Sequence, residues 1–204
     1  MNIKLFREHI IQSDAIRLAW NLSIVYLCYY ICRMVFLFEN WHIFGNEIDW
    51  SLFVRLSAGG LKFDTSAIAY TNAIVILMFL LPLHTKEKRS YHAITRAIYA
   101  AVNTICIILN MVDSVLFEFR RHRITTETFR EFQNENNLFK IFVTEAVNHW
   151  YLILIVIALS YILWRLYACP VKNRTSLKRY YFSRTLLLLL FGTAAVWGLS
   201  LIHI

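Results

Sequence analysis

Glycine and proline are scarce in this sequence, with 5 and 2 residues among 204, and charged residues make up only 17%. By contrast, 58% of the residues are apolar and 16% are aromatic. This composition fits neither a soluble domain nor an intrinsically disordered chain. It indicates an integral membrane protein.

The apolar runs also lack the strict alternation of polar and apolar residues that is typical of a barrel strand. Several runs instead approach or exceed the roughly 20 residues that a helix needs to cross about 30 Å of hydrocarbon. The sequence therefore predicts an all-α, polytopic membrane protein in which residues 1–204 form a single transmembrane domain.

No CxxC pair is present, and all four cysteines fall inside or at the end of apolar runs: Cys28, Cys32, Cys106 and Cys169. We interpret them as small buried hydrophobic residues and not as disulfide partners or zinc ligands. Cys28 and Cys32 share one helical face, but a structural role is favoured over a metal site there too.

Positive charge is distributed in a way that argues against nucleic-acid binding. The formal net charge is +8, yet the lysines and arginines lie between the apolar runs and form no tail or stripe. Such a distribution is typical of membrane topology signals. We therefore expect membrane phospholipids, and no nucleic acid, as partners.

Five apolar runs are expected to cross the membrane, at about 18–38, 64–83, 97–119, 149–168 and 185–204. The first is too long for the apolar core of a signal peptide and has no cleavage pattern behind it, so it is expected to stay as an anchor. Amphipathic helices along the membrane surface are expected at about 47–58 and 128–146. Gly59-Gly60 is expected to break the first of these before the chain enters the bilayer.

Most of the 21 Lys and Arg residues lie in the N-terminal segment and in the turns after the second and fourth spans. Because positive charge marks the cytoplasmic side, the N-terminus is predicted inside and the C-terminus outside. In the third span, Asn103, Asn110 and Asp113 form a polar stripe that is expected to face neighbouring helices, because amides and carboxylates avoid lipid.

This orientation brings charged and polar groups from several spans to the outer leaflet. There we expect an ion-pair or lipid-headgroup cluster of Arg33, Lys62, Asp64, Asn110, Asp113, Arg120, Arg121 and Arg123. Arginine is suited to phosphate because its planar fork donates two parallel hydrogen bonds. The alternative is that Arg120, Arg121 and Arg123 only contact anionic headgroups.

Catalytic motifs are missing as well. The sequence contains no GxSxG, HExxH, P-loop or Rossmann glycine pattern, and its seven histidines are scattered. His84, His92 and His149 are interpreted as residues at the membrane interface and not as ligands. No cofactor or metal is expected to bind this chain itself.

Three stretches carry a resemblance: residues 60–68 (GLKFDTSAI), 110–113 (NMVD) and 119–126 (FRRHRITT). They resemble the membrane-embedded N-terminal region of the lipoteichoic acid synthase-like family of sulfatase-fold phosphoglycerol transferases, especially as that region looks in Bacteroidetes. The order and spacing of the stretches and the expected five spans also fit, so the resemblance covers nearly the whole chain.

The resemblance implies a bacterial inner (plasma) membrane protein with an extracytoplasmic alkaline-phosphatase-like domain after the fifth span. In that domain a threonine, activated by a divalent metal such as Mn or Mg, would take a phosphoglycerol or related headgroup from a phospholipid. Such transferases or sulfatase-like hydrolases modify cell-envelope polymers or glycans. This chain has neither the nucleophile nor the metal ligands, so it is expected to be truncated before the catalytic domain.

The function implied for this chain is therefore to anchor the enzyme and to orient its lipid substrate. Two alternatives from other classes stay open: a small transporter or channel subunit, with the polar stripe of the third span as its pathway, and a membrane scaffold without catalysis. The sequence shows neither an inverted repeat nor a helix broken by Gly or Pro, both of which are frequent in transporters.

Overall fold

The computed structural model describes residues 14–44, 49–80, 88–120 and 138–170. Their regular elements are all helices: α2 (Asp14–Glu39), α3 (Trp41–Phe44), α4 (Trp50–Thr71), α5 (Ala73–Leu80), α6 (Arg89–Arg120), α8 (Leu138–Asn148) and α9 (Trp150–Leu166). The prediction of an all-α protein is confirmed for this part of the chain.

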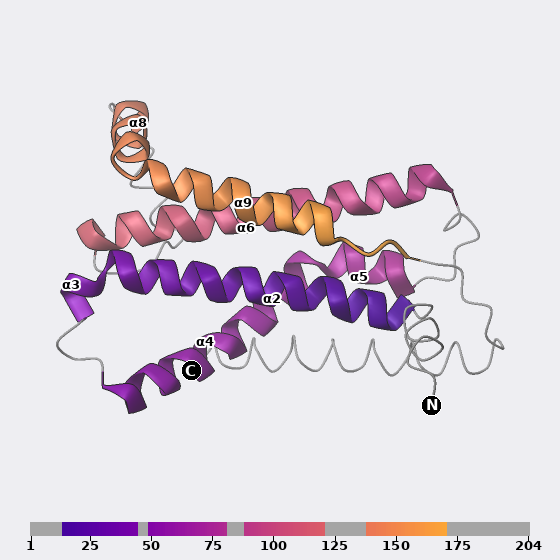
Figure 1. Cartoon of the computed structure of the whole chain (residues 1–204), viewed down its shortest axis with the longest axis horizontal. Helices are drawn as coiled ribbons and strands as arrows, with labels where there is room; N and C mark the ends of the chain where they lie inside the picture. The colour runs from indigo at the N-terminus through magenta and orange to yellow at the C-terminus, as the bar shows by residue number, and fades with distance from the viewer. Residues whose placement is uncertain (1–13, 45–48, 81–87, 121–137, 171–204) are drawn as a thin grey trace.

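The long helices lie side by side along the longest axis of the molecule (Figure 1). Helices α2 and α6 run in the same direction, whereas α9 and the pair α4–α5 run back in the opposite direction. Helix α8 stands at a steep angle to this axis, at the end where α9 begins. The described chain therefore passes up and down the bundle four times.

The number of spans differs from the five predicted. Two described helices, α2 and α6, are long and apolar enough to cross a membrane, and α4–α5 makes a third if the bent pair counts as one span. Helix α9 has 17 residues, which at 1.5 Å per residue gives about 25 Å, short of the roughly 30 Å of hydrocarbon. The predicted span 185–204 lies outside the described residues.

The break predicted at Gly59-Gly60 was wrong. Helix α4 runs through both glycines, so the predicted surface helix 47–58 and the start of the predicted span 64–83 belong to one element. A glycine inside a helix costs only about 1 kcal/mol relative to alanine, which packing can offset.

The helix breaks instead at Asn72, where α4 and α5 meet at 63°. Two side chains at this point bind carbonyls of the preceding turn. Thr71 Oγ1 donates to the Ala67 carbonyl at 2.8 Å, and Asn72 Nδ2 donates to the Ile68 carbonyl at 3.2 Å. Side-chain donors inserted among the backbone hydrogen bonds are a known cause of such bends.

Two other boundaries also changed. Helix α6 begins at Arg89, eight residues before the predicted span 97–119, and therefore includes part of the basic turn. Of the predicted surface helix 128–146, residues 138–146 lie in α8, and residues 128–137 fall outside the described residues.

Helix α2 lies at the centre, packed against α3, α4, α5, α6 and α9. Apolar side chains from all the long helices form the core, among them Leu18, Val25, Ile68, Phe79, Tyr99, Ile107 and Leu163. Cys28 and Cys32 are buried in this core, as predicted. Three asparagines are also completely buried at 0% exposure: Asn21, Asn72 and Asn103.

Candidate functional site

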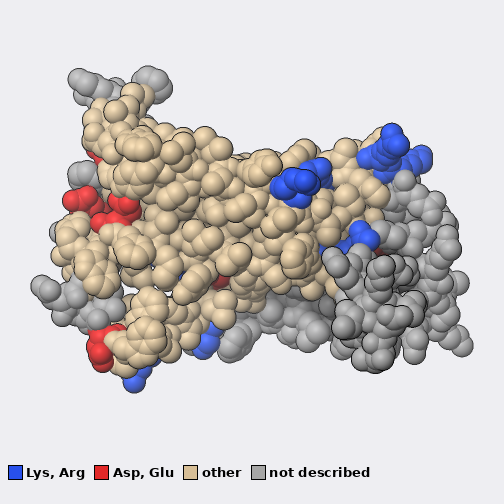
Figure 2. All heavy atoms as spheres, in the orientation of Figure 1, with Lys and Arg blue, Asp and Glu red and all other residues tan. Residues whose placement is uncertain are grey.

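Charge is divided between the two ends of the bundle (Figure 2). Basic residues near the starts of α2 and α6 and the end of α9 define what we name the basic end: Arg17, Lys88, Arg89, Arg96 and Arg165. Four carboxylates define the acidic end, where α2 and α6 end and α8 and α9 meet: Glu39, Asp49, Glu118 and Glu145. The division has exceptions: the buried Asp14 lies at the basic end, and the exposed Arg55 lies in the first turns of α4, close to Asp49 in the sequence.

Two of the predicted site residues form an ion pair between α2 and α4. Arg33 Nη2 lies 2.6 Å from Asp64 Oδ2, and the two side chains are 15% and 18% exposed. Arg33 Nη1 also donates to the Ser57 carbonyl at 3.2 Å. The positive charge of Arg33 is therefore neutralised at the place where α4 packs against α2.

Gly60 makes room for this arrangement. A Cβ atom at this position would overlap the Arg33 guanidinium, whereas a Cβ at Gly59 would meet no atom within 4 Å. Within the stretch 60–68, Gly60 and Asp64 therefore face Arg33 from successive turns of the same helix face. We conclude that this part of the stretch positions α4 against α2.

The other predicted site residues lie elsewhere. Asn110 Nδ2 donates to the Cys106 carbonyl of its own helix at 2.9 Å, and Asp113 is buried at 8% exposure. Lys62 is exposed on α4. Arg120 is the last residue of α6 and its side chain is not described, while Arg121 and Arg123 fall outside the described residues.

Of the polar stripe predicted on the third span, Asn103 faces another helix. Asn103 is completely buried and exchanges two hydrogen bonds with Asn72 at the bend between α4 and α5. Asn103 Nδ2 donates to Asn72 Oδ1 at 2.8 Å, and Asn72 Nδ2 donates to Asn103 Oδ1 at 3.1 Å. The two amides satisfy each other, which is what burial of such groups requires.

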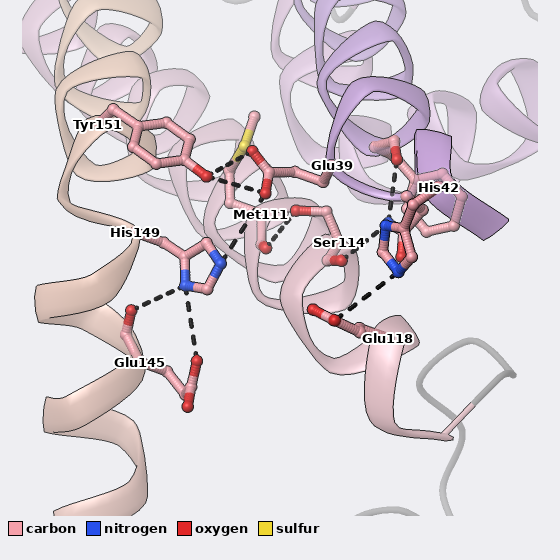
Figure 3. Close-up of polar contacts among 10 residues, drawn as sticks. Glu39, His42, Met111, Ser114, Glu118, Glu145, His149 and Tyr151 are labelled. Carbon is pink, nitrogen blue, oxygen red and sulfur yellow. Dashed lines mark hydrogen bonds and ion pairs between the residues drawn. The ribbon is translucent and has the colours of Figure 1, made fainter. Parts of the chain in front are cut away.

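A cluster that sequence reasoning missed lies at the acidic end (Figure 3). The Tyr151 hydroxyl lies 2.7 and 2.8 Å from the two carboxylate oxygens of Glu39 and donates to them. His149 lies between two carboxylates, with Nε2 3.9 Å from Glu39 Oε2 and Nδ1 3.5 Å from Glu145 Oε2. The cluster thus joins the junction of α8 and α9 to the end of α2.

One signal for this cluster was present in the sequence. Glu145 and His149 are four residues apart, a spacing that brings side chains together on a helix. Nothing in the sequence indicated Glu39, because it lies 112 positions from Tyr151. Tertiary packing alone brings the two together.

A second set of contacts at the acidic end ties α3 to α6. His42 Nε2 lies 3.7 Å from Glu118 Oε1, with both side chains about half exposed. Asn40 Nδ2 donates to the carbonyls of Phe36 and Ser114, each at 3.0 Å. These contacts hold the short helix α3 against the end of α6.

At the basic end, side chains of α2 and α6 bind the end of α9 and the residues after it. The contacts are Arg96 Nε to the Trp164 carbonyl (3.0 Å), Trp20 Nε1 to the Leu166 carbonyl (3.1 Å), Asn21 Nδ2 to the Ala168 carbonyl (2.9 Å) and Arg17 Nη1 to the Cys169 carbonyl (2.9 Å). Asn21 Oδ1 also accepts from the Ala168 amide at 2.8 Å. Carbonyls that lack partners at a helix end are satisfied in this way.

Among the described residues, no group of three or more His, Cys, Asp and Glu side chains is arranged to hold a metal ion. The chain matches no family model, and no curated protein or solved structure matches it.

Proposed function

We propose that this chain is a membrane domain that anchors an extracytoplasmic, metal-dependent enzyme acting on phospholipid headgroups and orients its lipid substrate. The enzyme would be a phosphoglycerol or phosphoethanolamine-type transferase, or a sulfatase-like hydrolase, of a bacterial inner membrane. The metal, Mn or Mg, would belong to a catalytic domain that these 204 residues do not include.

The observation that carries the proposal is the composition of the acidic end. Helix α6 ends there at Arg120, so the sequence Arg120-Arg121-His122-Arg123 starts from that end. Helix α8 lies at the same end, at a steep angle to the bundle, with Val143 and Val147 exposed four residues apart. An apolar helix face at the end of the bundle where α6 reaches Arg120 is suited to the boundary between acyl chains and phosphates.

The division of charge supports an orientation with this end outside. The basic end would face the cytoplasm, because the N-terminal segment and the turns after the second and fourth predicted spans carry 13 of the 21 Lys and Arg residues, against 7 in the other two connectors. The acidic end would then face the compartment of the catalytic domain. The Arg33–Asp64 pair would lie below the outer surface, where mutual neutralisation lowers the cost of placing two charges near lipid.

Lipid binding by the purified chain tests the proposal. We expect native mass spectrometry to show retention of phosphatidylglycerol in preference to phosphatidylcholine. Arg121→Ala together with Arg123→Ala should weaken that retention about tenfold or more, because hydrogen bonds to charged groups contribute about 1.5–3 kcal/mol. Arg89→Ala, at the opposite end, is the matched control and should have little effect.

If both lipids are retained equally, or if the double variant and the control lose the same amount of bound lipid, these arginines only contact anionic headgroups and do not select the substrate. Reading the encoding gene beyond codon 204 tests the enzyme part of the proposal separately. An open frame that encodes a threonine nucleophile with Asp, His and Glu metal ligands is expected. A different domain would refute the assignment to this enzyme class.

One observation favours the transporter or channel alternative. The bend of 63° at Asn72 makes α4–α5 a discontinuous helix, and transporters often build substrate sites at such breaks. Against it, Asn72 and Asn103 are both completely buried and bind each other. Uptake or conductance in vesicles that is lost in Asn103→Leu would nevertheless favour a pathway over an anchor.

A further inference from the structure

His149 lies at the junction of α8 and α9, and its two ring nitrogens face carboxylates of two different helices (Figure 3). Nδ1 lies 3.5 Å from Glu145 Oε2 of α8, and Nε2 lies 3.9 Å from Glu39 Oε2 at the end of α2. The exposed fractions of the three side chains lie between 17% and 24%. Solvent therefore screens their attraction less than it screens ion pairs at an open surface. We name these two contacts the His149 bridge.

The protonation state of the imidazole decides whether both contacts are favourable. Nδ1 also lies 3.1 Å from the Glu145 carbonyl oxygen, so it faces two acceptors. A neutral imidazole carries a single proton, which these acceptors favour on Nδ1, and the lone pair of Nε2 then faces the Glu39 carboxylate. An imidazolium carries a proton on each nitrogen and attracts both carboxylates. The complete His149 bridge therefore requires the imidazolium.

Glu145 is the side chain through which α8 takes part in this bridge. Among the side chains of α8 that the structure describes, at 143–148, Glu145 is half-buried and the other five are exposed. The polar link from these side chains to α2 runs from Glu145 through His149 to Glu39. Tyr151 forms a separate link, because its hydroxyl donates to Glu39 and holds the start of α9 against α2.

The other titratable groups near the bridge are arranged differently. His42 of α3 lies 3.7 Å from the carboxylate of Glu118 in α6, and both side chains are about half exposed. In ordinary surroundings, glutamate and tyrosine side chains titrate at about pH 4 and about pH 10. Histidine changes its charge between about pH 5 and 8. Within that interval, pH therefore acts on the bridge through the imidazole, and the hydrogen bonds of Tyr151 to Glu39 persist.

We propose that the His149 bridge is a pH-dependent hinge that fixes the angle between α8 and the bundle. The imidazolium holds Glu145 to Glu39, and α8 keeps its steep angle (Figure 1). Loss of the Nε2 proton breaks the contact with Glu39, and α8 then moves about the junction. The backbone at His149 suits a hinge, because its φ of −110° and ψ of 38° lie outside the helical range. The inference does not depend on the proposed function, since it concerns only the position of α8.

Distance measurements between two spin labels test the hinge on the full chain in lipid nanodiscs. The four native cysteines are replaced by alanine, and labels are attached at Val143→Cys on α8 and Leu27→Cys on α2, both of which are exposed. We expect a narrow distribution of distances at about pH 5 and a broader or displaced one at about pH 8, because only the imidazolium joins the two carboxylates.

Three substitutions connect this change to the bridge. His149→Gln cannot become charged and should give the broad distribution at both pH values. Glu39→Gln keeps an acceptor for Tyr151 but removes the charge that faces Nε2, so it should give the same result even if His149→Gln fails to fold. His42→Gln is the matched control, because it removes the other described histidine of the acidic end, and the pH response should remain.

The proposal is overturned if the labelled protein shows the same distribution at both pH values. It is also overturned if the response persists in the bridge variants or disappears in His42→Gln. The last result would assign the response to the pair of His42 and Glu118 and not to the His149 bridge.

Hydrogen exchange provides a second measurement that keeps the native cysteines, in case their removal disturbs the fold. Exchange of the amides at 142–148 is compared at the two pH values after correction for the intrinsic effect of pH. It should be about threefold faster at the higher pH, as expected for the loss of a partly exposed ion pair, and equally fast at both in His149→Gln. The amides at 155–160, in the middle of α9, should not change. Equal corrected rates at 142–148, or the same change at 155–160, would overturn the proposal.

Discussion

Gly59 and Gly60 are neighbours in α4, but they meet different surroundings. Gly60 lies against the Arg33 guanidinium, and Gly59 faces open space. The two positions therefore separate the general cost of glycine in a helix from a specific need for glycine. The difference can be measured with the smallest substitution available.

We predict that Gly60→Ala destabilises the protein and Gly59→Ala stabilises it. The first displaces Arg33 from Asp64, at a cost of about 1.5–3 kcal/mol for hydrogen bonds to charged groups. The second gains about 0.5–1 kcal/mol because alanine favours the helix. Thermal unfolding in detergent measures both changes.

An Arg33→Ala background is the control for this comparison. Without the guanidinium, Gly60→Ala should lose its penalty and behave like Gly59→Ala. If the penalty persists in that background, the contact with Arg33 does not explain the glycine.

The buried pair of Asn72 and Asn103 allows a second prediction at the same scale. Asn72→Leu or Asn103→Leu alone should each destabilise the protein by about 1–3 kcal/mol, because the remaining amide is left without its partner. The double variant should cost clearly less than the sum, since no unpaired amide remains. A double-mutant cycle of unfolding free energies measures this coupling, and strictly additive costs would contradict it.

At the scale of elements, the end of α9 is held by side chains that lie about 150 positions earlier in the chain. Asn21 forms two of these contacts, with the carbonyl and the amide of Ala168. They fix the point from which the chain leaves the bundle. The position of the chain at this point therefore depends on hydrogen bonds between α2 and the end of α9.

We predict that Asn21→Leu loosens the end of α9 without unfolding the bundle. Both hydrogen bonds of Ala168 are lost, and hydrogen exchange of the amides at 166–169 should become about tenfold faster or more, given net contributions of about 0.5–1.5 kcal/mol for each bond. Ser23→Ala is the control, because Ser23 Oγ donates only to the Ala19 carbonyl of its own helix. Unchanged exchange in Asn21→Leu would mean that Arg17 and Trp20 suffice.

At the scale of the whole molecule, charge distinguishes the two ends of the bundle (Figure 2). The described basic end carries five Lys and Arg side chains and one buried carboxylate. The opposite end carries the acidic cluster of Figure 3 together with Arg55 on α4 and Arg120 as the last residue of α6. Such asymmetry determines orientation through the positive-inside rule.

We predict that residues near the acidic end are accessible from outside the cell. Ser51→Cys at the start of α4 should react with a membrane-impermeant maleimide in intact cells. Ser90→Cys at the start of α6 should react only after the membrane is permeabilised; both positions are exposed. The reverse pattern would invert the proposed orientation, and labelling of both in intact cells would argue against a membrane-spanning arrangement.

Several features were predicted correctly from local sequence. Long apolar runs indicated helices, and α2 contains the whole predicted span 18–38. Asn103 was predicted to face other helices because an amide is costly in lipid, and it does so. Arg33 and Asp64 were placed at the same level of the bundle by counting from the ends of their spans, and the structure brings them within 2.6 Å.

Other features were not predictable because they depend on contacts between distant segments. The helix continues through Gly59-Gly60 because α2 packs against it and Arg33 fills the space that glycine leaves. The bend at Asn72 depends on a partner amide 31 positions away, at Asn103. Periodicity and local propensity carry no information about either contact.

The sequence by itself determined the class of this protein, because composition and the length of apolar runs decide whether a chain prefers lipid to water. It also determined which segments are rich in Lys and Arg, and from these an orientation is predicted. Only the tertiary structure decided where α4 bends, which face of α2 stays uncovered and which residues meet Glu39. Each of these depends on side chains that come together only when the helices pack.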